Sequence, residues 1–146
     1  MDHFMSGGLA ALVVMLCILI EYESLNGLER LSRLLRRHRW IVLITMCGLI
    51  VSHIVQIWVF AVGFYAGENW LGFGSIDTDS TIIGSTTAWM DYAYYSAVVY
   101  TTLGFGDMVP QAGLRMLTMA EALAGFSLLT WSASFTFLQM QRLWRP

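Results

Sequence analysis

Residues 100–107 read Tyr-Thr-Thr-Leu-Gly-Phe-Gly-Asp, and this stretch decides the fold more than any other part of the chain. In an ordinary strand successive carbonyl groups point to opposite sides, so several carbonyls face one axis only if left-handed and right-handed backbone dihedrals alternate. Gly104 and Gly106 permit positive φ without a side-chain penalty. The stretch therefore predicts a line of oxygens, with the Thr102 hydroxyl at its inner end, that can replace the water shell of a cation.

This stretch resembles the pore signature of potassium channels, TTVGYGD, which reads TTLGFGD here. The surrounding residues 87–140 match the family in order: Tyr94-Tyr95-Ser96 on a pore helix, Pro110 after the filter, and an inner-helix glycine at Gly125. The resemblance implies a homotetramer in which four chains bind K⁺ at a shared filter. The implied ion-binding carbonyls belong to Thr102, Leu103, Gly104, Phe105 and Gly106, supported by Thr101, Asp107, Tyr94 and Tyr95.

The stretch departs from the signature at Leu103, which replaces valine, and at Phe105, which replaces tyrosine. The leucine side chain points away from the axis, so we expect selectivity to survive. Phe105 lacks a hydroxyl that could bond to the pore-helix tyrosines, so the filter is held less rigidly. A potassium-selective channel is the leading interpretation. A less selective cation channel and a non-conducting membrane regulatory subunit that keeps the pore fold are the alternatives.

Composition independently indicates a membrane protein. Hydrophobic residues make up 57% of the chain and charged residues only 12%, with a mean hydropathy of +0.62. Apolar spans cover residues 4–25, 40–66 and 114–138, and each is long enough to cross a bilayer core of about 30 Å. The sequence therefore predicts an all-α membrane protein with three transmembrane helices, the first of them additional to a two-span pore domain over residues 40–140.

The charged residues predict the orientation. The chain has no lysine, and the segment between the second and third spans carries five acidic residues against one arginine. Most arginines lie after the first or the third span, on what the positive-inside rule makes the cytoplasmic side: Arg30, Arg33, Arg36, Arg37, Arg39, Arg142 and Arg145. We therefore expect an integral protein of the cell (inner or plasma) membrane, with its amino terminus outside and its carboxyl terminus in the cytoplasm.

The pore domain divides into five predicted segments. An outer helix covers residues 40–66, an outer loop 67–87, a pore helix 88–100, the filter 101–107 and an inner helix 114–140. Thirteen residues of helix span about 20 Å, so the pore helix cannot cross the membrane and must be re-entrant. The Gly72-Phe73-Gly74 triplet repeats the GFG of the filter, but it lacks preceding threonines and is interpreted as a loop.

Several polar or small residues within the spans are candidates for function. Gly125 is a hinge or a close packing contact, and Glu121 is either a structural hydrogen-bonding partner of the pore helix or a titratable part of the gate. Thr130 and Ser134 recur at helical spacing and could line the inner cavity. A further set falls partly on one face of the second span and favours hydrogen-bonded packing: Thr45, Ser52, His53 and Gln56.

Residues 26–39 form an arginine-rich linker with the three-residue period of a voltage sensor, Arg30, Arg33, Arg36 and Arg39. Only one span precedes it, and the segment is too polar to insert. Its leucines favour instead a short cytoplasmic interfacial helix, whose arginines from Arg30 to Arg39 contact anionic lipid headgroups.

Other functional classes find no support in the sequence. Cys17 and Cys47 lie in apolar spans without metal-site spacing and are expected to be free thiols. No phosphate loop, nucleophile triad or pair of carboxylates indicates an enzyme. We expect no cofactor, no metal other than K⁺ at the filter carbonyls, and no nucleic-acid partner.

Overall fold

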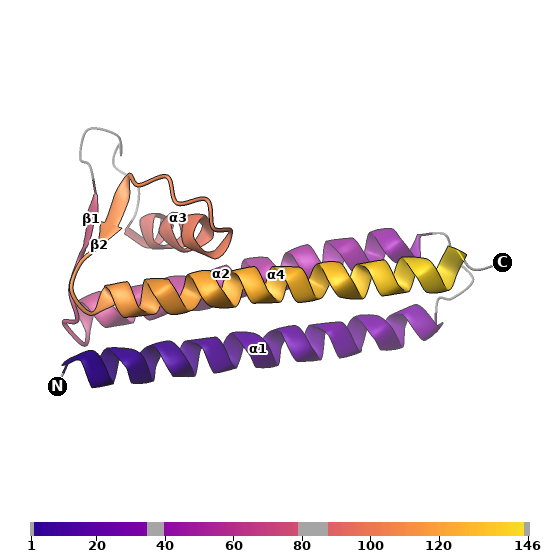
Figure 1. Cartoon of the computed structure of the whole chain (residues 1–146), viewed down its shortest axis with the longest axis horizontal. Helices are drawn as coiled ribbons and strands as arrows, with labels where there is room; N and C mark the ends of the chain where they lie inside the picture. The colour runs from indigo at the N-terminus through magenta and orange to yellow at the C-terminus, as the bar shows by residue number, and fades with distance from the viewer. Residues whose placement is uncertain (1, 35–39, 79–87, 145–146) are drawn as a thin grey trace.

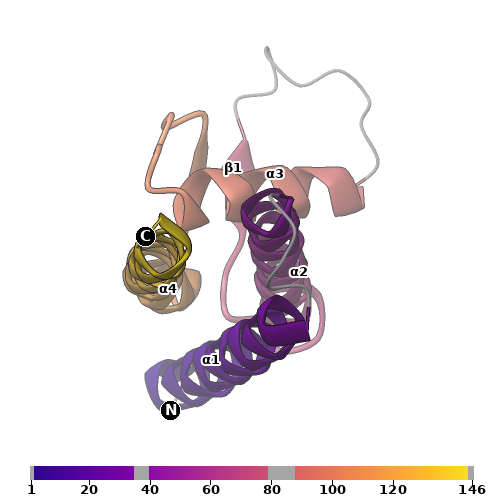
Figure 2. The same ribbon diagram turned by 90° about the vertical axis from the view of Figure 1, so that its right-hand side faces the viewer.

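The computed structural model describes residues 2–34, 40–78 and 88–144. Its elements are, in chain order, α1 (Asp2–Leu34), α2 (Ile41–Asn69), β1 (Ile76–Thr78), α3 (Ala88–Tyr100), β2 (Met108–Pro110) and α4 (Leu114–Trp144). Three long helices lie side by side, and the short α3 lies on the opposite side of α2 and α4 from α1 (Figure 1 and Figure 2). The amino end of the chain shares one end of the bundle with the sheet, and the carboxyl end lies at the other.

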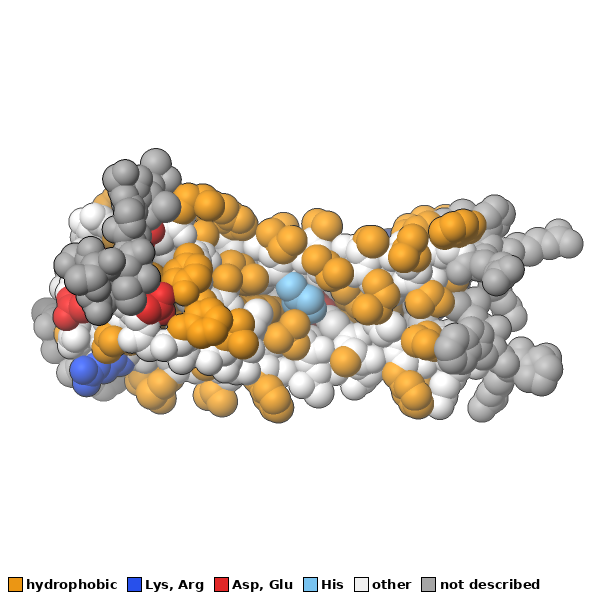
Figure 3. All heavy atoms as spheres, turned by 90° about the horizontal axis from the view of Figure 1, so that it is seen from above, with side chains coloured by type: hydrophobic (Ala, Val, Ile, Leu, Met, Phe, Trp, Pro, Cys, Tyr) orange, Lys and Arg blue, Asp and Glu red, His pale blue; other side chains and the backbone are white. Residues whose placement is uncertain are grey.

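Two of the long helices have the length and composition to cross a membrane, over Met5–Leu34 and Ile41–Asn69. α4 is long enough, with 31 residues, but it carries more polar side chains than these two helices. Among the described residues it does not meet the requirement for apolar composition. Hydrophobic side chains are spread along the length of the visible face, while charged ones gather at the end that carries the sheet (Figure 3). This distribution suits a bundle surrounded by lipid along its length.

α1 continues through residue 34, well past the end predicted for the first span at residue 25. The prediction of a separate interfacial helix is therefore wrong for residues 26–34, while residues 35–39 lie outside the described part of the chain. The cause is packing against α2, where Leu28 fills the space beside Gly48: a Cβ added to that glycine would lie 2.7 Å from the Leu28 Cδ2 atom. Glu29 and Arg33 then form a hydrogen bond of 2.9 Å across the last turns.

The outer loop predicted over residues 67–87 contains an unexpected strand. β1 pairs antiparallel with β2, placing Ile76 opposite Pro110 and Asp77 opposite Val109. Three-residue strands are too short for alternating hydrophobicity to reveal them. The sheet joins the outer loop to the segment that follows the predicted filter, and the Ser75 carbonyl extends this connection by accepting the Gln111 amide at 2.8 Å. Residues 79–87 lie outside the described part.

The hydrophobic core lies where the four helices meet. Phe60 and Phe64 of α2 are fully buried, together with Tyr100 of α3 and Leu117 of α4, and Cys17 of α1 packs in the same cluster. The Phe64 ring meets the Tyr95 ring edge-on, with centroids 5.0 Å apart. These contacts fix α3 against α2 and α4, which determines where the segment after α3 begins.

Aromatic side chains also cluster where α2 ends and α3 begins. Tyr65 stacks on Trp89 with ring centroids 4.3 Å apart and meets Trp70 edge-on at 6.0 Å. At the other end of α2, Trp40 is exposed. Trp and Tyr are enriched at both membrane–water interfaces, so these two groups mark the ends of the apolar part of α2.

Candidate functional site

The segment after α3 begins as a helix cap. The Leu103 amide donates to the Val98 carbonyl at 3.0 Å, and the Thr102 amide donates to the Val99 carbonyl at 2.9 Å. This pair of bonds is a Schellman motif, which places Thr102 at the position where glycine is the usual residue. Thr102 accordingly has φ of 61°, an uncommon value for a β-branched residue. The strained conformation is thus imposed by the end of the pore helix.

Positive φ then recurs at every second residue. Thr102, Gly104 and Gly106 have φ values of 61°, 58° and 81°, and Leu103 and Phe105 between them lie outside this region. The alternation was predicted at the two glycines but not at Thr102. A Cβ added to either glycine would meet nothing within 4 Å, so the backbone conformation rather than space requires glycine here. Alternation of this kind turns successive carbonyls toward one side.

The carbonyl oxygens of residues 101–106 accept no hydrogen bond within the described part of the chain. Residues 101–106 are exposed in the single chain, so their carbonyls, which are strong acceptors, are open to a partner from outside it. The Leu103 and Phe105 side chains are also 61% and 65% exposed in the single chain. The segment therefore presents unpaired oxygens and two large apolar side chains that one chain alone does not cover.

Two of the predicted supporting residues bind each other. The Tyr94 hydroxyl donates to the Asp107 Oδ2 atom at 2.8 Å, which ties α3 to the end of the predicted filter segment. That carboxylate, by accepting the phenolic hydrogen, raises the pKa of Tyr94 above its ordinary value. The Thr101 hydroxyl bonds back to the Ala97 carbonyl at 2.7 Å. The Tyr95 hydroxyl instead faces α4, where it lies 2.9 Å from the Thr118 hydroxyl.

Glu121 contacts the pore helix in the way that the structural interpretation predicted. The Ser96 hydroxyl donates to the Glu121 Oε1 atom and also lies 2.8 Å from the Ile57 carbonyl. Glu121 is fully buried, and its Oε2 atom has no partner among the described residues. This contact holds the middle of α3 against α4, and a role of Glu121 in gating stays a prediction.

Gly125 allows α4 to approach the end of the pore helix. A Cβ added at Gly125 would lie 2.2 Å from the Tyr100 carbonyl oxygen, a contact with backbone that no side-chain rotation relieves. α4 also runs as one helix through this position. The geometry therefore gives Gly125 a packing role, and of the two predicted roles it supports this one.

Thr130 and Ser134 lie on an exposed face of α4. Their hydroxyls donate to carbonyls one turn earlier, Thr130 to Phe126 at 2.7 Å and Ser134 to Thr130 at 3.0 Å. Hydroxyls paired in this way are compatible with either lipid or a wet cavity, and cavity lining stays a prediction.

A buried polar chain that the sequence did not predict leads to Tyr100. The Tyr100 hydroxyl donates to the Gln56 Oε1 atom and lies 3.0 Å from the His53 Nδ1 atom. The Gln56 Nε2 atom donates in turn to the Glu21 Oε2 atom at 2.7 Å. The grouping of Ser52, His53 and Gln56 on one face of α2 was a signal of this chain, but the sequence did not show that Glu21 lies opposite them.

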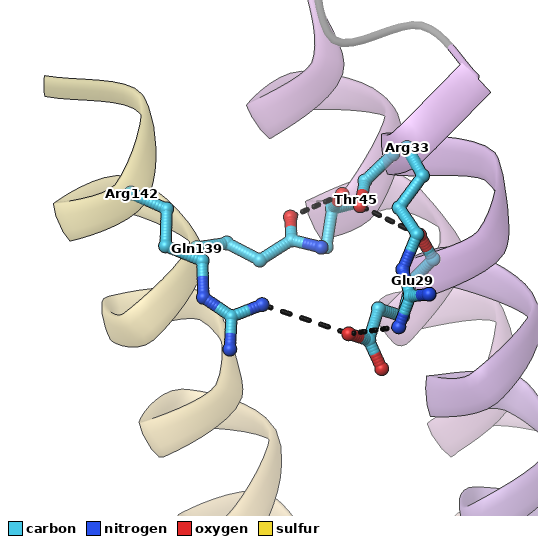
Figure 4. A network of polar contacts seen from close by, with 6 residues as sticks. Glu29, Arg33, Thr45, Gln139 and Arg142 are labelled. Carbon is cyan, nitrogen blue, oxygen red and sulfur yellow. Dashed lines mark hydrogen bonds and ion pairs between the residues drawn. The ribbon is translucent and has the colours of Figure 1, made fainter.

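A second polar cluster (Figure 4) lies near the carboxyl ends of α1 and α4, at the end of the bundle away from the sheet (Figure 1). Glu29 of α1 lies 2.9 Å from Arg33 and 3.5 Å from Arg142 of α4. The Thr45 hydroxyl donates to the Gln139 Oε1 atom at 3.0 Å. These contacts join the last turns of α1 and α4 and the first turn of α2. No group of three or more His, Cys, Asp or Glu side chains within residues 2–34, 40–78 and 88–144 could hold a metal ion.

Residues 40–142 match a family model described as ion channel, a two-span pore-loop domain. The match covers more than half of the chain and includes α2, α3 and the filter segment, so the chain belongs to this family of ion channels. The match agrees with the resemblance to potassium channels. Comparison with curated proteins and with solved structures gave no match. The family and the two apolar helices together make the chain an integral membrane protein, and α1 precedes the matched residues.

Proposed function

We propose that the protein is a potassium-selective channel that conducts K⁺ passively through a filter formed by the carbonyls of residues 102–106. The observation that carries the proposal is the recurrence of positive φ at Thr102, Gly104 and Gly106, which suits a line of inward-facing oxygens. Because these oxygens have no hydrogen-bonding partner within the described residues, they are available to replace the water shell of an ion. The proposal includes no enzymatic activity and no cofactor.

A homotetramer is part of this proposal. One chain supplies a single line of oxygens, whereas an ion needs oxygens on all sides, so four chains around one axis are the simplest closed arrangement. The exposed Leu103 and Phe105 side chains support it, because a neighbouring chain would cover them. The inner cavity below the filter would then be lined by α4, including Thr130 and Ser134.

We also propose that the sheet end of the bundle is extracellular, which places the amino terminus outside and the carboxyl terminus in the cytoplasm of a cell-membrane protein. Asp77 and Asp107 lie at the sheet end and would attract cations. Arg33 and Arg142 lie at the other end, where anionic lipid headgroups of the inner leaflet would be within reach.

Ion flux into liposomes tests the proposed function. The purified protein is reconstituted, a K⁺ gradient is imposed, and K⁺ uptake is compared with Na⁺ uptake. We expect K⁺ uptake to exceed Na⁺ uptake by at least about tenfold, because carbonyl cages discriminate between the two ions. Equal uptake of both ions would make the protein a general cation channel, and absence of uptake at every tested pH, lipid composition and voltage would leave the non-conducting regulatory subunit.

Gly104 and Gly72 offer a matched pair of variants. Both have positive φ, 58° and 64°, and at both an added Cβ meets nothing within 4 Å. Gly104→Ala and Gly72→Ala therefore impose the same backbone strain, inside and outside the filter. We expect only Gly104→Ala to abolish K⁺ flux. Equal flux from the two variants would refute the assignment of the filter.

A further inference from the structure

Glu21 of α1 is fully buried and joins three helices. Its Oε2 atom accepts the Ser52 hydroxyl at 3.0 Å and the Gln56 Nε2 atom at 2.7 Å, both from α2. Its Oε1 atom accepts the hydroxyl of Ser132 from α4. A carboxyl group buried among apolar helices is costly without partners, so three donors at one carboxyl group indicate a built arrangement.

Gln56 extends this arrangement to the pore helix. Its Nε2 atom donates to Glu21 and to the Ser52 hydroxyl, while its Oε1 atom accepts the Tyr100 hydroxyl. Both ends of the amide are therefore in use, and turning it over would place its oxygen against the Glu21 carboxyl oxygen and break that bond. The position of the Tyr100 hydroxyl thus depends on where Glu21 holds Gln56.

Tyr100 is the last residue of α3, and the filter threonines follow it directly. Tyr100 is held in place by contacts from both α2 and α4. Gln56 holds its hydroxyl, and α4 lies so close to its carbonyl that Gly125 has no room for a Cβ. A shift of Tyr100 would move Thr101 and the strained Thr102, because the same helix end forms the cap that sets the Thr102 conformation.

We propose that Glu21 is a positioning residue for the filter: through Gln56 it fixes the Tyr100 hydroxyl, and through Ser132 it fixes the inner helix. α1 is then a working part of the pore, although it precedes the residues that match the ion channel family. This inference rests on the proposed function, because it concerns the inner end of the same filter.

The first experiment replaces Glu21 by glutamine and compares it with Glu23→Gln. Glu23 is exposed on the same helix, so the control makes the same chemical change without touching the polar chain. The amide has one oxygen where the carboxyl group has two, so at least one of the three donors loses its acceptor. We expect Glu21→Gln to lower K⁺ flux per protein by about tenfold, the equivalent of one hydrogen bond to a carboxyl group, and to lower the K⁺/Na⁺ flux ratio. Glu23→Gln should retain both.

Tyr100→Phe interrupts the chain beyond Gln56, and it keeps the proposal falsifiable if Glu21→Gln does not fold. We expect Tyr100→Phe to lower the K⁺/Na⁺ ratio in the same direction. If Glu21→Gln and Tyr100→Phe act through the same hydrogen bonds, the double variant should lower the K⁺/Na⁺ flux ratio no more than the worse of the two single variants does. Wild-type flux and ratio in Tyr100→Phe would overturn the proposal, as would losses that multiply in the double variant.

The exchange Glu21→Gln with Gln56→Glu restores a carboxyl–amide pair between the same helices, with the donor and acceptor reversed. We expect this double variant to recover a K⁺/Na⁺ flux ratio within about threefold of wild type. One carboxyl oxygen at position 56 can accept from the Tyr100 hydroxyl, while the other accepts from the amide at position 21. Recovery of the unfolding temperature without recovery of the ratio would reduce the role of Glu21 to stability and overturn the proposal.

The two failures are distinguishable. If the wild-type protein carries no K⁺ flux, the proposed function fails and this inference falls with it. If the wild-type protein is K⁺-selective and Glu21→Gln matches Glu23→Gln in flux and ratio, only the positioning role of Glu21 fails.

Discussion

Gly125→Ala distinguishes a packing contact from a hinge. The added Cβ would lie 2.2 Å from the Tyr100 carbonyl oxygen, 2.9 Å from its carbonyl carbon and 3.0 Å from its Cα atom. Ordinary contact requires a separation of roughly 3.4–4 Å, so α4 and the end of α3 must move apart by about 1 Å. Because all three contacted atoms are backbone, the strain can be relieved only by shifting a whole helix.

The magnitude follows from two opposing effects. Forcing an extra methyl group into a packed site costs about 1–3 kcal/mol, and replacing a helical glycine by alanine returns up to about 1 kcal/mol. We therefore expect a net destabilisation of about 1–2 kcal/mol per chain, which lowers the midpoint of thermal unfolding by roughly 3–8 °C. The same displacement at Tyr100 should reduce K⁺ flux.

Thermal unfolding followed by circular dichroism, together with liposome flux, measures both effects. Gly27→Ala is the matched control, because Gly27 also lies inside a long helix but an added Cβ meets nothing within 4 Å. We expect this control to leave the unfolding midpoint unchanged or slightly raised. A wild-type midpoint in Gly125→Ala would refute the packing argument, and a wild-type midpoint with reduced flux would favour the hinge.

Three further predictions concern the filter and its supports. Gly104→Ala should abolish K⁺ flux, measured in liposomes, because a non-glycine residue in the left-handed region costs roughly 1–2 kcal/mol. Tyr94→Phe should lower the K⁺/Na⁺ flux ratio, because it removes the hydroxyl that donates to Asp107. Glu121→Gln should keep flux within about twofold of wild type across pH, because the amide retains an oxygen that can accept from Ser96.

The first two of these predictions have an exposed counterpart elsewhere in the chain. Gly72→Ala carries equal strain outside the filter, and Tyr22→Phe removes an exposed hydroxyl from α1. An unchanged ion ratio in Tyr94→Phe would show that Asp107 needs no support from the pore helix. A difference between Glu121→Gln and wild type that changes with pH would instead favour the titratable gate.

The predictions made from the sequence succeeded where structure is local. Positive φ at Gly104 and Gly106 followed from the need to turn alternate carbonyls, and the pore helix has the bounds that its length and flanking residues indicated. Thr102 was missed because its conformation comes from the cap of the preceding helix, which is a property of hydrogen bonds and not of residue type. The end of α1 was misplaced because the packing of Leu28 beside Gly48 depends on a neighbouring helix.

The partners of Glu21 also could not be predicted from the sequence, because they depend on how the helices pack. Residue spacing placed Ser52 and Gln56 on one face of α2, but it could not show which helix covers that face. A periodic pattern indicates that one face of α2 is polar. The residue that accepts from this face, Glu21, lies 31 positions from Ser52 and 35 positions from Gln56 in the chain. Only the arrangement of α1 against both α2 and α4 makes one carboxyl group the acceptor for both helices.

This arrangement bears on whether the matched residues 40–142 form a pore without α1. Ser52 and Gln56 of α2 and Ser132 of α4 are all buried, and all three donate to Glu21. Without α1 these groups would face lipid, where an unsatisfied polar group costs several kcal/mol. We therefore expect residues 40–142 to be less stable without α1, because that helix supplies the carboxyl group to which both α2 and α4 donate.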